Sequence, residues 1–255
     1  MSIILKSDEE VAVMRQAGRV VATVLDILRT KVQPGMRTKE LDVIAARELK
    51  RLGATPSFKG VPNPQGYEDF PANLCVSVND EIVHGIPGKR VLKEGDIVSL
   101  DFGAIYNGFQ GDAALTVGVG KISPEAKNLI EATEGALKAG IEAGHAGGRM
   151  GDISAAIQDY AESRGFSVVR EYTGHGIGRE MHEEPQIPNY GEPGEGPLLR
   201  KGMTFALEPM VNAGNWLTRP GDDHWVVLTA DGSLSAHFEH TVAVTNGKLE
   251  VLTAL

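Results

Sequence analysis

The chain has 255 residues, 42% of them hydrophobic, which is enough for one well-buried domain or at most two small ones. Its 25 basic and 34 acidic side chains leave a formal charge of −9, which argues against a broad nucleic-acid surface because such a surface needs clustered Lys and Arg. The single cysteine, Cys75, excludes an intrachain disulfide and a cysteine-based zinc cluster. No secretory signal or long apolar run is evident, so we expect a cytoplasmic protein without membrane association.

The sequence predicts four helices. Ser7 precedes the first, and Glu10 three residues later completes the pattern of a capping box. Thr38 is expected to cap the second helix and Gly53 to follow its end, while Pro124 opens the third. The helices are expected over residues 8–29, 38–52, 124–142 and 152–165.

Strand patterns fill much of the remaining chain. The Asn107-Gly108 pair between two apolar runs predicts a hairpin turn. Strands are expected over residues 74–83, on both sides of that pair, and over 203–211, 224–230, 237–245 and 248–254. Because helices and strands are mixed along the chain, an α/β or α+β fold is expected.

A faint internal repeat connects the two halves of the chain. A glycine, an arginine two residues later and a glycine 16 residues beyond it occur twice, as Gly35, Arg37 and Gly53 and as Gly147, Arg149 and Gly165. Each half then carries His-Gly-Ile and two acids, namely Asp101 and Asp112 in the first half and Glu208 and Glu239 in the second. We interpret this as duplication of a half-domain, with halves of about residues 1–123 and 124–255 that bring the four acids together.

Four converging acids require counter-charges. Asp101 and Glu208 both lie among apolar residues, and a buried carboxylate must be neutralised, paired or bound to a metal ion. Two divalent cations balance four carboxylates, and His175 in the sequence TGHGIG is a candidate nitrogen ligand. An oxygen-rich ligand set with one imidazole suits Mn, Fe, Co or Zn.

Each of these residues also has a simpler interpretation. Asp112 follows a glycine and could cap a turn, Glu239 could be an exposed cross-strand partner, and His84 could be a hydrogen-bonded loop histidine. No single residue establishes a site, but the repeated set favours the metal-binding interpretation. Outside that set, we interpret Cys75 as a small buried hydrophobe and His224, His237 and His240 as solvent-side or hydrogen-bonded strand residues.

Several motifs together resemble a known family. The segments NDEIVHGIP, SLDFGA, GDAALT, GHGIGREMHEEP, ALEPM and FEHTVAVT, in this order and spacing, look like those of type I methionine aminopeptidases over essentially the whole chain. The resemblance implies the α+β "pita-bread" fold of these metallopeptidases, with pseudo-two-fold symmetry and a curved, mostly antiparallel central sheet covered by helices on its outer face. It also implies one catalytic domain spanning residues 1–255.

The resemblance implies an activity and site residues. The expected reaction is removal of the N-terminal methionine from nascent proteins, by attack of a metal-bridging water or hydroxide on the first peptide bond, with a preference for a small second residue. His84 and His182 would bind substrate and stabilise the tetrahedral intermediate, and Glu208 would also move a proton. Five ligands for two metal ions carry over to Asp101, Asp112, His175, Glu208 and Glu239.

The methionine side chain needs an apolar pocket. The family's pocket positions fall near Phe58, Phe70, Cys75, Met181 and Trp225. Residues 58–74 form a longer segment than in many relatives, which leaves the side-chain preference of the pocket open.

Two other functions stay open at this point. A proline-specific peptidase of the same fold shares the five ligands but usually carries an additional N-terminal domain, for which this chain shows no room. A binding module of this fold without activity typically loses ligands, whereas this chain keeps all five. The expected partners are the N-terminal methionine of nascent polypeptides and the ribosome, with no nucleic-acid substrate, and the protein is expected to be a monomer.

Overall fold

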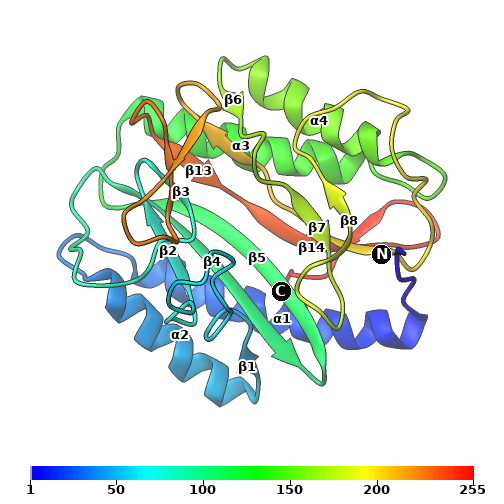
Figure 1. Ribbon diagram of the computed structural model, residues 1–255, viewed down its shortest axis with the longest axis horizontal. Helices are drawn as coiled ribbons and strands as arrows, with labels where there is room; N and C mark the ends of the chain where they lie inside the picture. Colours follow the sequence, from blue (N-terminus) through cyan, green and yellow to red (C-terminus); the bar gives the residue numbers. More distant parts are fainter. Residues whose placement is uncertain (1) are drawn as a thin grey trace.

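Four helices flank a nine-stranded sheet in the computed structural model, which describes residues 2–255 (Figure 1). The helices are α1 (Asp8–Lys31), α2 (Thr38–Leu52), α3 (Pro124–Ala143) and α4 (Met150–Glu162). Across residues 2–255, none of these helices is both long enough and apolar enough to cross a membrane.

The helix predictions are confirmed in position, with two corrections at helix starts. Ser7 and Glu10 form the predicted capping box at α1. The prediction that Thr38 caps α2 is wrong: the N-cap is Arg37, and the Thr38 hydroxyl instead accepts the Gly88 N–H at 2.8 Å. The fourth helix was expected to begin at Asp152 or its neighbour but begins at Met150. Asp152 lies in the first turn, and its carboxylate accepts the backbone N–H of the N-cap residue Arg149.

The repeated segments adopt the same local structure in both halves. Arg37 and Arg149 are the N-caps of α2 and α4, and each backbone N–H is accepted by an acid three residues later, Glu40 or Asp152, at 2.7 Å. The glycines before and after each helix have positive φ, with values of 90° at Gly35, 70° at Gly53, 88° at Gly147 and 83° at Gly165. The sequence repeat therefore encodes a repeated loop and helix with the same cap.

All strand pairs of the central sheet are antiparallel. In spatial order its main path is β1 (Thr55–Pro56), β4 (Ile97–Tyr106), β5 (Phe109–Gly118), β14 (Glu239–Val244), β9 (Thr204–Leu207), β7 (Gly174–Gly176) and β8 (Glu183–Ile187). Strand β2 (Cys75–Val78) pairs with β4, and β15 (Leu249–Val251) pairs with β14.

Two three-stranded sheets complete the fold. One orders β13 (Ser235–His237), β10 (Met210–Asn212) and β6 (Ser167–Val168). The other orders β11 (Thr218–Pro220), β12 (Val227–Thr229) and β3 (Glu81–Val83).

The structure divides some predicted strands. The Asn107-Gly108 turn is confirmed, with φ of 49° and 78° at the two residues, as a type I′ hairpin requires. The run predicted over 203–211 breaks into β9 and β10 at Glu208 and Pro209, because proline has no N–H for the sheet ladder. The run predicted over 237–245 breaks at Phe238, and that over 224–230 shortens to β12.

The helices cover one face of the sheet, which leaves the other face for the acids. Alternate strand residues such as Leu100, Phe102 and Val242 are fully buried on the helix-covered side. One core cluster joins α1 and α2 to β4, and a second joins α3 and α4 to β9 and β14. The predicted α+β fold with a mostly antiparallel sheet and helices on its outer face is confirmed.

Candidate metal centre

Sheet register places three acids on one face. Asp101 on β4 pairs with Ala114 on β5, and Ala114 pairs with Glu239 on β14. Residues directly opposite in antiparallel strands share a face, so the Asp101 and Glu239 side chains lie on the same side. Asp112 lies two residues before Ala114 on β5, and the period of two puts it on that face as well.

The same argument adds His175 and Glu208. Ala206 on β9 pairs with both His175 on β7 and Thr241 on β14. Thr241 lies two residues after Glu239, and Glu208 lies two residues after Ala206. The register of five strands therefore gathers four of the predicted ligands on the face opposite the helices, and Glu208 follows directly after the end of β9.

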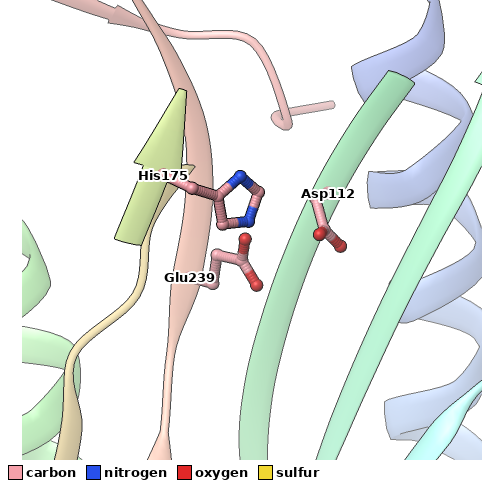
Figure 2. A group of neighbouring side chains, drawn as sticks. All are labelled: Asp112, His175 and Glu239. Carbon is pink, nitrogen blue, oxygen red and sulfur yellow. The ribbon is translucent and has the colours of Figure 1, made fainter. Parts of the chain in front are cut away.

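Three of the five side chains meet closely enough to hold one ion. Single ligand atoms of Asp112, His175 and Glu239 all lie within 4.8 Å of one another, and Figure 2 shows their side chains converging between β5, β7 and β14. His175 Nε2 also lies 3.5 Å from Glu208 Oε1. Asp101 is near enough for its charge to raise the pKa values of Asp112 and Glu239.

Burial makes this group of acids hard to ionise without cations. Burial raises the pKa of Asp101 to about 7. Burial first, and neighbouring carboxylates second, raise the pKa values of Asp112, Glu208 and Glu239 well above the usual range. One buried oxygen on each of Asp101, Asp112 and Glu239 has no hydrogen-bond partner among residues 2–255. Unpaired buried carboxylate oxygens of this kind fit divalent cations.

His175 is prepared to act as a nitrogen ligand. Its Nδ1 lies 2.9 Å from the Gly176 carbonyl, which can only accept, so Nδ1 carries the proton and Nε2 presents its lone pair to the carboxylates. Burial, followed by the nearby His182, lowers the pKa of His175 to about 4. The imidazole is therefore neutral at physiological pH, as metal ligation requires.

A cavity of about 360 Å³ opens beside these carboxylates, and His84 and His182 both line it together with His175 and Glu208. The His175 and His182 ring centroids are 4.4 Å apart. His84 has φ of 62°, in the left-handed region that side chains other than glycine rarely adopt. Such strain is typical of functional positions, and the role of His84 stays a prediction.

An apolar cluster adjoins His84. Phe70, Ala72 and Cys75 are buried, and Phe58, Ile86 and Trp225 pack against them. Trp225 contacts both Phe70 and His84 edge-to-face, with ring centroids 5.2 Å and 6.5 Å away. The structure therefore brings together four of the five pocket residues predicted from the sequence.

Met181 reaches the cluster from another side. It packs mainly against a separate core cluster that includes Val11 and Phe109. However, its Cε and the Cε1 of Phe58 each lie 2.9 Å from where a side chain on Gly103 would begin. Gly103 thus lets Met181 and Phe58 approach the sheet together.

The long segment at 58–74 is attached to the loop before β12. Tyr67 stacks on His224 with ring centroids 3.6 Å apart and an interplanar angle of 4°. The Trp225 indole donates to the Glu68 carbonyl at 2.9 Å, and the Asn63 amide donates to the His224 carbonyl at 3.0 Å. These contacts hold the segment that carries Phe70 against Trp225.

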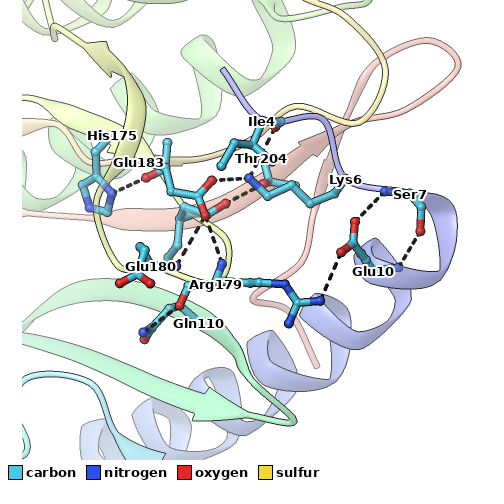
Figure 3. A network of polar contacts seen from close by, with 12 residues as sticks. Ile4, Lys6, Ser7, Glu10, Gln110, His175, Arg179, Glu180, Glu183 and Thr204 are labelled. Carbon is cyan, nitrogen blue, oxygen red and sulfur yellow. Dashed lines mark hydrogen bonds and ion pairs between the residues drawn. The ribbon is translucent and has the colours of Figure 1, made fainter. Parts of the chain in front are cut away.

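A buried carboxylate holds the loop that carries Met181 and His182. Glu183 accepts the Arg179 N–H at 3.0 Å and the Glu180 N–H at 3.4 Å through one oxygen, and pairs with the Lys6 ammonium through the other (Figure 3). The Lys6 and Glu183 side chains are only 3% and 6% exposed. The N-terminal segment thereby fixes a loop of the candidate site.

Replacing Glu183 with Ala is expected to lower the free energy of unfolding by about 3–5 kcal/mol, because the Lys6 ammonium would stay buried without its partner. Urea denaturation measures this change. The matched control is Asp8→Ala, which breaks the exposed Lys201 pair at 2.8 Å and should cost less than about 1 kcal/mol. Equal effects of the two substitutions would show that the buried pair does not stabilise the fold.

One histidine of the site was not predicted. His237 was expected at the solvent side or in a strand hydrogen bond, but its side chain is 2% exposed and neither ring nitrogen has a hydrogen-bond partner among residues 2–255. The sequence carried no usable local signal, because the break at Phe238 puts His237 on β13 and Glu239 on β14. His240 and His224 fit the expectation, since His240 Nδ1 lies 2.9 Å from the Thr253 hydroxyl and His224 is exposed.

Comparisons with known proteins identify the family. Residues 12–246 match the model of metallopeptidase family M24. The chain is 52% identical to methionine aminopeptidase 1 of Bacillus subtilis, over 98% of this chain and 99% of that protein, and 51% identical to methionine aminopeptidase of Clostridium perfringens, over 99% of each.

Solved structures extend the comparison to the fold. The crystal structure of methionine aminopeptidase from Thermotoga maritima matches with a TM-score of 0.95 and 46% identity, over 100% of both chains. Prolidase from Pyrococcus furiosus matches 99% of this chain with a TM-score of 0.77 at 22% identity, which shows a shared fold. The resemblance found in the sequence motifs is confirmed, and the chain belongs to metallopeptidase family M24.

Proposed function

We propose that this protein is a metal-dependent aminopeptidase that removes the N-terminal methionine from polypeptides. The observation that carries the proposal is the convergence of Asp112, His175 and Glu239 on the open face of the sheet, beside an apolar cluster. Near-full-length relatives at about half identity are named methionine aminopeptidases, which supports the same activity here.

We assign the metal centre to the five side chains on that face. Asp101, Asp112, His175, Glu208 and Glu239 would hold two divalent cations, with Mn, Fe, Co or Zn as the candidates. Bound there, the cations would polarise the first peptide carbonyl and lower the pKa of water so that hydroxide is available at neutral pH. Two cations also balance the four carboxylate charges, which burial otherwise disfavours.

The apolar cluster would receive the methionine side chain. Phe58, Phe70, Cys75 and Trp225 supply aromatic and sulfur surface next to His84, and thioethers contact aromatic rings favourably. Met181 would close the pocket where it meets Phe58 over Gly103. We propose a small second residue in the substrate, as in the family that this chain resembles.

The two cavity histidines would contact the peptide itself. Burial and the neighbouring His182 lower the pKa of His84 to about 4, so a neutral imidazole faces the substrate and can donate one N–H. His84 and His182 would stabilise negative charge that develops on the peptide oxygen. Glu208 would take the proton of the attacking water and pass it to the departing amine.

Replacing His84 with Ala is expected to lower kcat by roughly 10²–10⁴-fold, while the affinity for metal stays near that of the unmodified protein. The reason is that His84 lines the cavity without joining the group of ligand atoms. Steady-state kinetics and metal titration test the two parts separately. Loss of metal from the His84→Ala protein would mean that the residue is a ligand.

The function itself is tested with two peptides. The metal-loaded protein should release methionine from Met-Ala-Ser and should not cleave an X-Pro dipeptide. Cleavage of the dipeptide alone would favour the proline-specific alternative. A purified protein that neither binds divalent metal nor cleaves either peptide would favour a binding module.

We further propose that the substrates are nascent polypeptides, encountered in the cytoplasm near the ribosome. We also propose that the protein acts as a monomer. Its single domain would be built from two halves, at about residues 1–123 and 124–255. The repeated helix caps of the two halves support the division. The net charge of −9 gives no support to a nucleic-acid substrate.

A further inference from the structure

His237 is a buried histidine whose two ring nitrogens lack hydrogen-bond partners among the described residues. It ends β13, where its backbone N–H and its carbonyl both contact the Thr116 hydroxyl at 2.9 Å. The backbone is therefore fixed, but neither ring nitrogen has a hydrogen-bond partner among residues 2–255. A buried polar group without a partner is costly, so a native protein retains one where it serves a site.

The imidazole points at two candidate metal ligands. His237 Nε2 lies 3.7 Å from Glu208 Oε2 and 3.9 Å from Glu239 Oε2. The other oxygen of Glu208, Oε1, lies 3.5 Å from His175 Nε2. Glu208 thus stands between two imidazoles, with one carboxylate oxygen directed at each.

The backbone of Glu208 does not fix this arrangement by itself. Glu208 lies outside the sheet ladder, between β9 and β10, and its carbonyl accepts the Asn189 amide at 3.0 Å. This backbone contact does not set the side-chain torsions, and a carboxylate ligand needs an outer partner that fixes its orientation. His237 is placed to do this, because it approaches the carboxylate oxygen that does not face His175.

We propose that His237 is a positioning residue for Glu208: the imidazole donates Nε2–H to Glu208 Oε2 and leaves Oε1 free to ligate metal beside His175. The approach from 3.7 Å to hydrogen-bond distance needs only a small rotation of the Glu208 side chain. The inference rests on the proposed function in one respect, namely that divalent cations occupy the site.

The test compares three replacements of His237 by titrating Mn²⁺ into chelator-treated protein in a calorimeter. His237→Leu removes the donor and should weaken Mn²⁺ binding by roughly 10–100-fold. His237→Gln places an amide nitrogen close to the position of Nε2 and should stay within a few-fold of the unmodified protein. His237→Asn is too short to reach Glu208 and should behave like Leu.

The matched control is His240→Leu. His240 is the next strand histidine, it bonds Thr253 instead of a carboxylate, and its loss should leave Mn²⁺ affinity unchanged. If the His237→Leu variant does not fold, the Mn²⁺ affinities of the His237→Gln and His237→Asn variants are compared instead. Thermal unfolding of the metal-free variants reports on folding separately.

Unchanged Mn²⁺ affinity in the Leu or Asn variant would overturn the inference. Equal weakening in the Gln and Leu variants would also overturn it, because the imidazole itself would then be required, as for a direct ligand. Methionine release by the unmodified protein is measured in parallel. Its absence would refute the proposed activity, whereas the Mn²⁺ affinities would still decide the role of His237.

Discussion

Replacing Asp112 with Asn, or Glu239 with Gln, is expected to abolish methionine release and to weaken metal binding by more than the roughly 10–100-fold that loss of an outer partner costs. Each substitution keeps the size of the side chain. It removes a negative charge and a ligand oxygen from a group of three side chains whose ligand atoms lie within 4.8 Å of one another. Both residues are at most 4% exposed, so solvent does not compensate for the loss of the negative charge beside the cations. Peptide assays and metal analysis of the purified variants measure the two effects.

Glu131→Gln is the control for this prediction. Glu131 is 62% exposed on α3 and pairs with Lys127 at 3.7 Å, so its substitution removes one charge without touching the site. It should leave both metal content and activity unchanged. Normal activity in the Asp112→Asn or Glu239→Gln protein would refute the assignment of the metal centre.

Removing the metal with a chelator is expected to abolish activity and to make stability depend on pH in a defined direction. Asp101 has a pKa of about 7 in the fold against a usual value of 3.8, and burial raises the pKa values of Asp112, Glu208 and Glu239 well above their usual values. As these groups titrate in the folded chain, they release protons that the unfolded chain has already lost at lower pH. The free energy of unfolding of the metal-free protein therefore falls as the pH rises to about 8.

Histidines do not reverse this trend in the chosen range. Burial lowers the pKa values of His84, His175 and His240 to about 4 and that of His237 to about 3, from 6.5. Below about pH 6.5 the unfolded chain holds their protons and stability rises with pH, which opposes the effect of the carboxylates. Above about pH 7 these imidazoles are largely neutral in both states, so the carboxylates set the direction.

Thermal unfolding with chelator and with excess Mn²⁺, at about pH 7 and about pH 8, tests this account. Each pKa unit by which a group differs between the folded and unfolded chain changes the free energy of unfolding by up to about 1.4 kcal/mol. Because cations replace protons on the carboxylates, the rise in Tm on adding Mn²⁺ should be larger at the higher pH. A metal-free protein that becomes more stable over this range would contradict the assigned carboxylate environment.

Helices were predictable because their signals are local. The Ser7 and Glu10 capping box and the glycine after α2 each use residues a few positions apart, and the structure confirms both. The correction at Arg37 arises because Thr38 bonds Gly88, which is 50 residues away in the sequence. Long-range contacts of this kind leave no pattern in a local window.

Short strands were less predictable than helices. Strand β7 has three residues and includes His175, and its conformation follows from pairing with β8 and β9 rather than from its own composition. Context of this kind generally outweighs the intrinsic strand preference of a segment. His175 could be proposed as a ligand from chemistry, but its strand could not be predicted.

The five candidate ligands were predictable because an internal repeat and family motifs both indicate them. The surrounding residues were not, since Lys6 and Glu183 lie 177 residues apart and pair only in the folded chain. His237 could be recognised only once the break at Phe238 and the burial under Thr116 were known.

Anomalous X-ray diffraction from crystals grown with Mn²⁺ tests the central claim most directly. The account predicts two anomalous peaks on the open face of the sheet, bounded by Asp101, Asp112, His175, Glu208 and Glu239. Crystals of the folded protein without anomalous scattering among these side chains would contradict it.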